Sequence, residues 1–328
     1  MPGHRTIDPP PLPGSALRPR IGLALGSGSA RGWSHIGVIQ ALSEIGVVPD
    51  IVCGTSIGSL VGAAYVSGRL DLLEQWVCQL SRRDVAGFFE ISLSLDGFVD
   101  IERLQSFLEQ TVVSPELRIE ELEKSFAAVA TELESGREVW FSQGRVIEAV
   151  MSSIALPGLF PPQLHNGRWL VDGGLVNPVP VSVCRALGAE VVIAVNLNGD
   201  IVGKHFAPRA LDERKAFREQ EKSSAKAETL AEQVKQTLRE YSSSLFNGLS
   251  DRPRPPNIFE TLAGSVNITQ DRITRSRMAG DPPDITLVPR LAQIGLLDFH
   301  RAKEAIQGGR RCVVQTAELI QEFVRPLQ

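Results

Sequence analysis

A serine flanked by glycines stands between a predicted strand and a predicted helix. Ser56 is the central residue of a G-x-S-x-G pentapeptide, Gly54-Thr55-Ser56-Ile57-Gly58. The apolar run 50–53 predicts the strand, and the apolar segment 57–66 predicts the helix. A sharp turn between two such elements strains the backbone of the central residue and exposes its side chain. It also requires small residues on either side. The pattern predicts that Ser56 is a nucleophile, with Gly54, Thr55, Ile57 and Gly58 as its elbow. A simple helix cap at Ser56 is the alternative.

A glycine-rich loop, GSGSARG at residues 26–32, follows an earlier predicted strand at 21–25. Successive backbone N–H groups in such a loop can bind an anion. An ester-cleaving serine needs donors of this kind for the oxyanion of its tetrahedral intermediate. Arg31 could orient the loop or meet a negative group of the substrate. The candidate oxyanion and substrate-binding residues are therefore Ser27, Gly28, Ser29 and Arg31.

Two other interpretations of this loop are open. Glycines after a first strand also bind the pyrophosphate of a dinucleotide, as in a nucleotide-binding oxidoreductase. That site needs an acidic residue at the end of the second strand, where Cys53 and Gly54 stand instead. The loop could also be purely structural, and His35, on the helix that follows it, is interpreted as structural.

The candidate base is Asp172, which follows an apolar run and precedes Gly173 and Gly174. Two glycines after the acid would let this segment approach another backbone turn closely, although an ordinary Asp-Gly hairpin turn has the same sequence. A triad in the order serine, acid, histidine would have to use His205 or His300. Both lie in segments expected to face solvent, so a dyad with Asp172 as the direct base is favoured. Asp172 must then be shielded, because the ordinary pKa of an aspartate is only about 3.9.

These residues need a fold that brings them together. Strand, helix, strand and helix with short connections favour parallel pairing in an α/β sheet. Two further helices are predicted with Asp71 and Asp100 as N-caps. The later predicted elements are helices at 71–80, 100–112, 145–154 and 258–278, a hairpin around 134–136, and strands at 189–198 and from 284.

The composition divides the chain into four parts. Residues 1–20 form a proline-rich tail expected to be disordered, and residues 21–200 form the core. Residues 201–283 form a charged, mostly helical insertion, and 284–328 complete the domain with a strand and helices. The insertion is a candidate lid, membrane-facing patch or oligomer contact, and Arg272, Arg275 and Arg277 within it could meet anionic headgroups.

The overall composition limits which partners and which cellular location are expected. The net charge of −4 provides no basic field, so nucleic acid is not an expected partner. The 4 cysteines are far apart in the sequence, which favours free thiols in a reducing cytosol. No apolar run approaches the roughly 18 residues that a membrane span needs, so a cytoplasmic location is expected, with peripheral contact at the inner membrane face as an option.

Together the three motifs resemble the patatin-like phospholipase family, most closely its bacterial branch related to neuropathy target esterase. The resemblance rests on LALGSGSARGWSHIGVIQAL, GTSIGSLVGAAY, SIALPGLFPP and WLVDGGLVNPVPVSVCRALGA, which occur in that order. It implies a three-layer sandwich with a mostly parallel central sheet, helices on both faces and a helical insertion. One departure is visible: Ser27 and Ser29 stand where the family usually has glycines, and serine adopts positive φ angles less readily.

The resemblance also implies an activity. Ser56 would attack a fatty-acyl ester of a phospholipid or lysophospholipid and form an acyl-enzyme. Asp172 would take the serine proton and later activate water, amides around Gly28 and Ser29 would hold the oxyanion, and no metal or cofactor is expected. The alternative is a catalytically idle patatin-like protein that acts as a regulatory or binding module.

Overall fold

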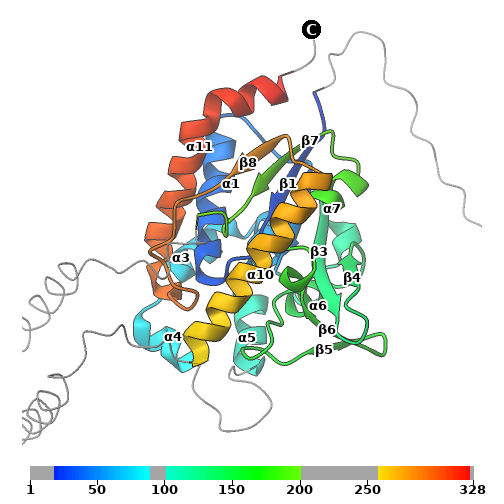
Figure 1. Ribbon diagram of the computed structural model, residues 1–328, viewed down its shortest axis with the longest axis vertical. Helices are drawn as coiled ribbons and strands as arrows, with labels where there is room; N and C mark the ends of the chain where they lie inside the picture. The colour runs from blue at the N-terminus through cyan, green and yellow to red at the C-terminus, as the bar shows by residue number, and fades with distance from the viewer. Residues whose placement is uncertain (1–17, 89–100, 201–257, 326–328) are drawn as a thin grey trace, which may run out of the picture. The chain divides into compact units, whose positions relative to one another are not determined.

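The central feature of the computed structural model is one mixed β-sheet (Figure 1). The structure describes residues 18–88, 101–200 and 258–325. In this part of the chain the sheet has 8 strands in the order β5-β6-β3-β2-β1-β7-β8, and β4 pairs with β3. The strands are β1 (Ile21–Leu25), β2 (Ile51–Thr55), β3 (Ser125–Glu132), β4 (Glu138–Phe141), β5 (Gln163–His165), β6 (Arg168–Asp172), β7 (Val191–Val195) and β8 (Ile285–Leu287).

The sheet is parallel at its centre and antiparallel at one side. The pairs β1–β2, β1–β7, β2–β3 and β7–β8 are parallel. The pairs β3–β4, β3–β6 and β5–β6 are antiparallel. The predicted parallel α/β sheet and the predicted hairpin around 134–136 are thus confirmed.

The helices follow the predicted order. They are α1 (Ser34–Glu44), α2 (Ile57–Val66), α3 (Leu70–Val77), α4 (Arg82–Phe88), α5 (Ile101–Phe107), α6 (Val146–Ser153), α7 (Val181–Ala186), α10 (Ile258–Gly280) and α11 (Ala302–Val324). α1 and α2 are each followed by a glycine at positive φ, Gly46 at 78° and Gly68 at 69°. The predicted N-cap at Asp71 is wrong: Arg69 is the N-cap of α3, and Asp71 lies in the first turn. Asp100 lies outside the described residues.

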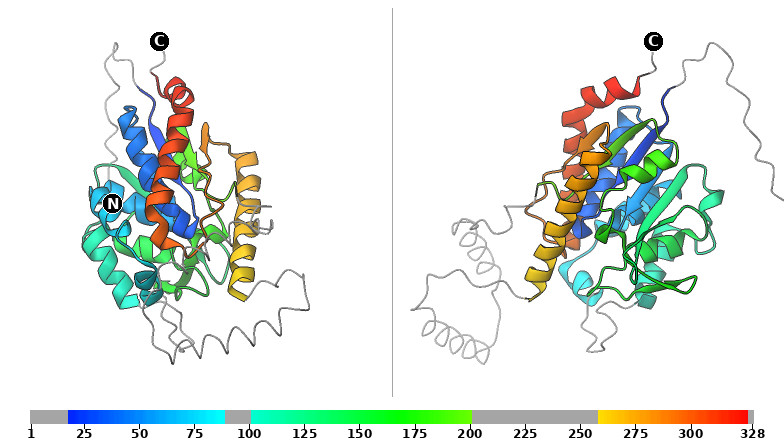
Figure 2. Two further views of the ribbon diagram at one scale, coloured as in Figure 1. Left: turned by 90° about the vertical axis from the view of Figure 1, so that its left-hand side faces the viewer. Right: turned by 45° about the vertical axis from the view of Figure 1, so that its right-hand side comes forward.

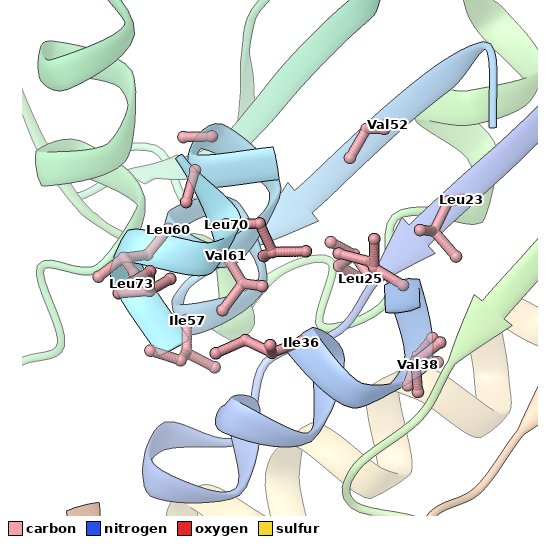
Figure 3. Packing of buried hydrophobic residues seen from close by; sticks show 14 of the residues in the cluster. Leu23, Leu25, Ile36, Val38, Val52, Ile57, Leu60, Val61, Leu70 and Leu73 are labelled. Carbon is pink, nitrogen blue, oxygen red and sulfur yellow. The ribbon is translucent and has the colours of Figure 1, made fainter. Parts of the chain in front are cut away.

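Helices cover both faces of the sheet, as the three-layer prediction requires (Figures 1 and 2). Because side chains alternate along a strand, Leu23 and Leu25 of β1 belong to one apolar core, and Ala24 belongs to another. The first core includes residues of α1, α2, α3, α6 and α11, and Figure 3 shows Leu25 near Ile36 of α1 and residues of α2. The second core includes residues of α7, with Met278 of α10 packed against it.

The described residues 18–88, 101–200 and 265–325 belong to one compact unit, called the main unit below. Most of the predicted insertion, 201–257, lies outside the described residues, as do 1–17 of the predicted tail. From Ser265 onward, α10 belongs to the main unit, whereas the sequence predicts it to be part of the insertion 201–283. All four cysteines are free thiols, as predicted. Within the described ranges, no helix combines the length and apolar character needed to cross a membrane.

Candidate active site

The pairing around β3 explains why Ser56 and Asp172, far apart in sequence, lie close together. Val129 of β3 pairs with Thr55 of β2 and also with a residue of β4. The next residue, Ala130, pairs with Asp172 of β6 and again with a residue of β4. A strand residue has one neighbour on each edge, so β2 and β6 lie end to end on the same edge of β3. Their carboxyl ends meet where Ser56 follows Thr55.

Ser56 occupies a strained turn between β2 and α2. Its φ of 55° and ψ of −127° are unusual for any residue other than glycine. The flanking glycines are required by close approach: a Cβ on Gly54 would lie 2.4 Å from the backbone nitrogen of Ser59, and one on Gly58 would lie 2.1 Å from the carbonyl oxygen of Leu25. The turn therefore has the geometry expected of a nucleophile elbow.

The side chains of Ser56 and Asp172 are in direct contact. The Ser56 hydroxyl donates a hydrogen bond of 2.5 Å to Oδ2 of Asp172. The carboxylate is buried, with 1% of the residue exposed. Burial raises the pKa of Asp172 to about 6, although hydrogen bonds from Ser56 and from the Gly174 amide act in the opposite direction. The burial that a base at this position would need is therefore present.

The acid loop is held rigidly at both ends of Asp172. The Asp172 amide donates to the carbonyl oxygen of Ala155 over 2.9 Å, and its own carbonyl accepts from the Thr131 hydroxyl over 2.8 Å. The Gly174 amide donates to Oδ1 of Asp172 over 2.6 Å. A Cβ on Gly173 would lie 2.1 Å from a carbonyl oxygen of β3. Asp172 thus ends a strand at a close backbone approach, which is not the ordinary hairpin turn.

Two backbone amides of the glycine-rich loop are available to a ligand. Backbone carbonyl oxygens accept from the loop amides of Gly26, Ser27, Ala30 and Arg31. Among the described residues, none accepts a hydrogen bond from the Gly28 or Ser29 amide. Both residues line the same cavity as Ser56 and Asp172. This is the arrangement needed to bind a developing oxyanion.

Arg31 lies behind this loop, away from the cavity lining formed by the described residues. It is fully buried, and its Nε and its amide both donate to the Gly28 carbonyl oxygen over 3.2 Å. In a trans peptide the carbonyl and the next N–H point in opposite directions, so this anchoring turns the Ser29 amide away from Arg31. Burial lowers the pKa of Arg31 to about 9. Of the two predicted roles, orienting the loop fits this position.

The serines at the family's glycine positions anchor the loop through their hydroxyls. Ser29 has a φ of 50°, and its hydroxyl donates to the carbonyl oxygen of Leu296 over 2.6 Å. A left-handed residue other than glycine costs about 1–2 kcal/mol, and one hydrogen bond offsets about 1 kcal/mol of this. Ser27 is buried, and its hydroxyl contacts Oε1 of Gln270 at 3.0 Å.

An apolar cavity opens beside Ser56 and Asp172. Its volume is about 120 Å³, whereas one water molecule needs roughly 10–15 Å³. Asp172 is the one charged residue among the described residues that line it. Sequence reasoning missed this lining, because the apolar residues come from several separate elements and look like ordinary core. They include Trp33, Leu60, Trp76, Leu104, Phe160 and Phe299.

The histidines of the described residues lie elsewhere. His35 is buried, its Nε2 is 2.8 Å from the Gly26 carbonyl oxygen, and burial lowers its pKa to about 4. His300 contacts Nε of Arg82 at 3.3 Å. None of the described histidines lines the cavity, and His205 lies outside the described ranges.

Two arginines of the predicted headgroup cluster already have protein partners. Arg275 pairs with Asp271 at 2.8 Å, and Arg277 pairs with Glu138 at 2.8 Å. Arg277 also donates to the carbonyl oxygen of Val176 over 3.2 Å. The Arg277 contacts join α10 to β4 and to the loop after β6, whereas the Arg275–Asp271 pair lies within α10.

Comparison with known proteins identifies related chains. Residues 23–185 match the family model described as patatin-like phospholipase. The chain is 32% identical to an "Uncharacterized NTE family protein" of Mycobacterium tuberculosis, and the alignment covers 92% of each chain. It is 29% identical to "Lysophospholipase NTE1" of Pyricularia oryzae over 88% of this chain and 18% of that protein. It is 34% identical to human "Patatin-like phospholipase domain-containing protein 6" over 54% of this chain and 13% of that protein.

Proposed function

Because this chain belongs to the patatin-like phospholipase family, within its NTE group, we propose that it is a serine acyl hydrolase that cleaves fatty-acyl esters of lipids. The observation that carries the proposal is the direct hydrogen bond between Ser56 and the buried carboxylate of Asp172. The relatives named as a lysophospholipase and a patatin-like phospholipase support the same class of substrate.

The first half of the proposed reaction forms an acyl-enzyme. Oγ of Ser56 attacks the ester carbonyl carbon while Asp172 accepts the hydroxyl proton. The amides of Gly28 and Ser29 donate to the oxyanion of the tetrahedral intermediate, where each donor is worth roughly 3–4 kcal/mol. The raised pKa of Asp172, about 6, makes the carboxylate a better proton acceptor than an exposed aspartate. The proton then passes to the departing alcohol oxygen.

The second half regenerates the enzyme. Asp172 takes a proton from a water molecule, and the water oxygen attacks the acyl carbon bound to Ser56. The same two amides hold the second oxyanion. Collapse of this intermediate breaks the bond to Oγ, returns the proton to Ser56 and releases a fatty acid.

The cavity supports a fatty-acyl chain as the bound part of the substrate. Its described lining is aromatic and aliphatic, apart from the polar groups beside Ser56. Burying each methylene of an acyl chain there gives about 0.8 kcal/mol. No basic side chain of the described residues lines the cavity, so a headgroup phosphate is proposed to stay outside it.

The test compares wild type with Ser56→Ala and Asp172→Asn, and uses Ser135→Ala as a matched control at an exposed hairpin serine. The measurements are covalent labelling by a fluorophosphonate and hydrolysis of acyl esters of increasing chain length. We expect labelling and hydrolysis of long-chain esters by the wild type and the control. Each site variant should lose at least about 10³-fold in hydrolysis. A folded wild type that neither labels nor hydrolyses any ester would favour the idle regulatory module instead.

A further inference from the structure

The face of α10 that packs into the main unit is polar. Its buried residues are Asn267, Gln270, Asp271 and Thr274, at the i, i+3, i+4, i+7 spacing of a single helix face. Such a face is usually apolar, and buried polar groups persist when they have specific partners. The partners of the first two residues belong to the glycine-rich loop: Asn267 Oδ1 accepts from Arg31 over 2.8 Å, and Gln270 contacts Ser27.

Gln270 also lines the cavity beside the dyad. Its Oε1 accepts from the Ser27 hydroxyl and from Nδ2 of Asn198, each over 3.0 Å. Two donors that meet at one oxygen determine the orientation of the amide. The NH2 group must therefore point away from the glycine-rich loop.

The NH2 group points toward the acid loop. A Cβ built on Gly174 would lie 2.4 Å from Nε2 of Gln270 and 2.9 Å from Oδ1 of Asp172. One side chain thus contacts the glycine-rich loop with its carbonyl oxygen, and its nitrogen lies against Gly174, the second residue after Asp172. A side chain at 174 would have to displace the end of Gln270 or of Asp172.

From this geometry we propose, building on the proposed function, that Gln270 is a positioning residue of the active site. Its carbonyl oxygen fixes Ser27 and hence the orientation of the Gly28 and Ser29 amides. Its NH2 group fixes the distance between that loop and Asp172. α10, which directly follows the segment 201–257, thereby supports both halves of the catalytic machinery.

The main test is Gln270→Met, which keeps side-chain length and removes both polar contacts. Gln315→Met, at an exposed position of α11, makes the same chemical change as a control. Displacing a catalytic group by about 1 Å can cost 10²-fold, so we expect Gln270→Met to lower kcat by about 10- to 100-fold. KM should change less than about threefold, because the acyl cavity is retained. The control should keep the wild-type kcat.

A double-mutant cycle separates positioning from loss of stability. Ser27→Ala and Gln270→Met should each slow fluorophosphonate labelling, and the double variant should be no slower than Gln270→Met alone, because both changes break one contact. Losses that multiply, or a kcat for Gln270→Met within threefold of wild type per folded molecule, would overturn the proposal. A wild type without labelling would instead count against the proposed function.

If Gln270→Met does not fold, Gln270→Glu is the variant that tests the proposal. The glutamate can still accept from Ser27 and Asn198, but it places a second carboxylate beside Asp172. Asp172 is the one charged group of the described cavity lining, with Arg31 behind the loop. A nearby like charge raises the pKa of a carboxyl group, so the acid limb of the labelling rate should move to higher pH. An unchanged acid limb would contradict the assigned position of the NH2 group.

Discussion

Asp172→Asn is expected to abolish hydrolysis and, at neutral pH, to stabilise the fold. The buried carboxylate has its pKa raised from 3.8 to about 6, mainly by desolvation. Between these values the unfolded chain binds fewer protons at this position than the folded chain does. The free energy of unfolding of the wild type therefore falls as pH rises through this window. An asparagine does not ionise and avoids this loss.

The size of the effect follows from the shift. The pKa of Asp172 rises by about 2, and each pKa unit corresponds to about 1.4 kcal/mol, which gives roughly 3 kcal/mol. The stability difference between Asp172→Asn and wild type should thus grow by up to about 3 kcal/mol in favour of the variant between roughly pH 4 and pH 8. All other titrating groups are shared by the two proteins, so the difference isolates this one carboxyl.

The stability difference between Asp172→Asn and wild type is measured by urea unfolding at a series of pH values. Asp71→Asn, at an exposed aspartate of α3, is the control. The control measures what the same substitution does at an exposed position of the fold. A difference between Asp172→Asn and wild type that stays constant from pH 4 to pH 8 would refute the view that burial sets the strength of this base. A difference that shrinks as pH rises would mean that folding lowers the pKa of Asp172 instead of raising it.

Three further outcomes are expected. Fluorophosphonate labelling of Ser56 should rise about tenfold per pH unit below the pKa of Asp172 and level off above about pH 6, whereas a flat profile would mean another base. Gly58→Ala should cost several kcal/mol in urea unfolding, because its Cβ would lie 2.1 Å from a β1 carbonyl oxygen. Gly46→Ala, in open space at φ 78°, should cost only about 1 kcal/mol. Ser29→Gly should stay within about 1 kcal/mol of wild type, since it loses one hydrogen bond and one strained φ, and Ser29→Ala should be less stable than Ser29→Gly.

The first half of the sheet could be predicted because its signals are local. Apolar runs mark β1 and β2, and Gly46 and Gly68 end the helices that follow them. The contact of Ser56 with Asp172 could also be predicted, because the motifs around both residues resemble the patatin-like family and the two candidate histidines lie in segments expected to face solvent.

The remainder depends on long-range contacts that leave little trace in the sequence. β6 has five residues, of which the first two are exposed and the last three buried, so its place on the edge of β3 could not be predicted from periodicity. The polar face of α10 looks solvated in the sequence, and only its packing against the glycine-rich loop reveals that Gln270 is buried. The residues that line the cavity come from several separate elements, so they too could not be identified from the sequence.

Because β2 and β6 lie end to end along β3, the contact between Ser56 and Asp172 depends on the register of these strands. A slip of one residue between β6 and β3 would move Asp172 by about 3.3 Å and turn its carboxylate to the opposite face of the sheet. The hydroxyl of Ser56 would then have no proton acceptor. Turnover is thus a stringent reporter of correct assembly, since a molecule paired one step out of register could keep its strands and still be inert.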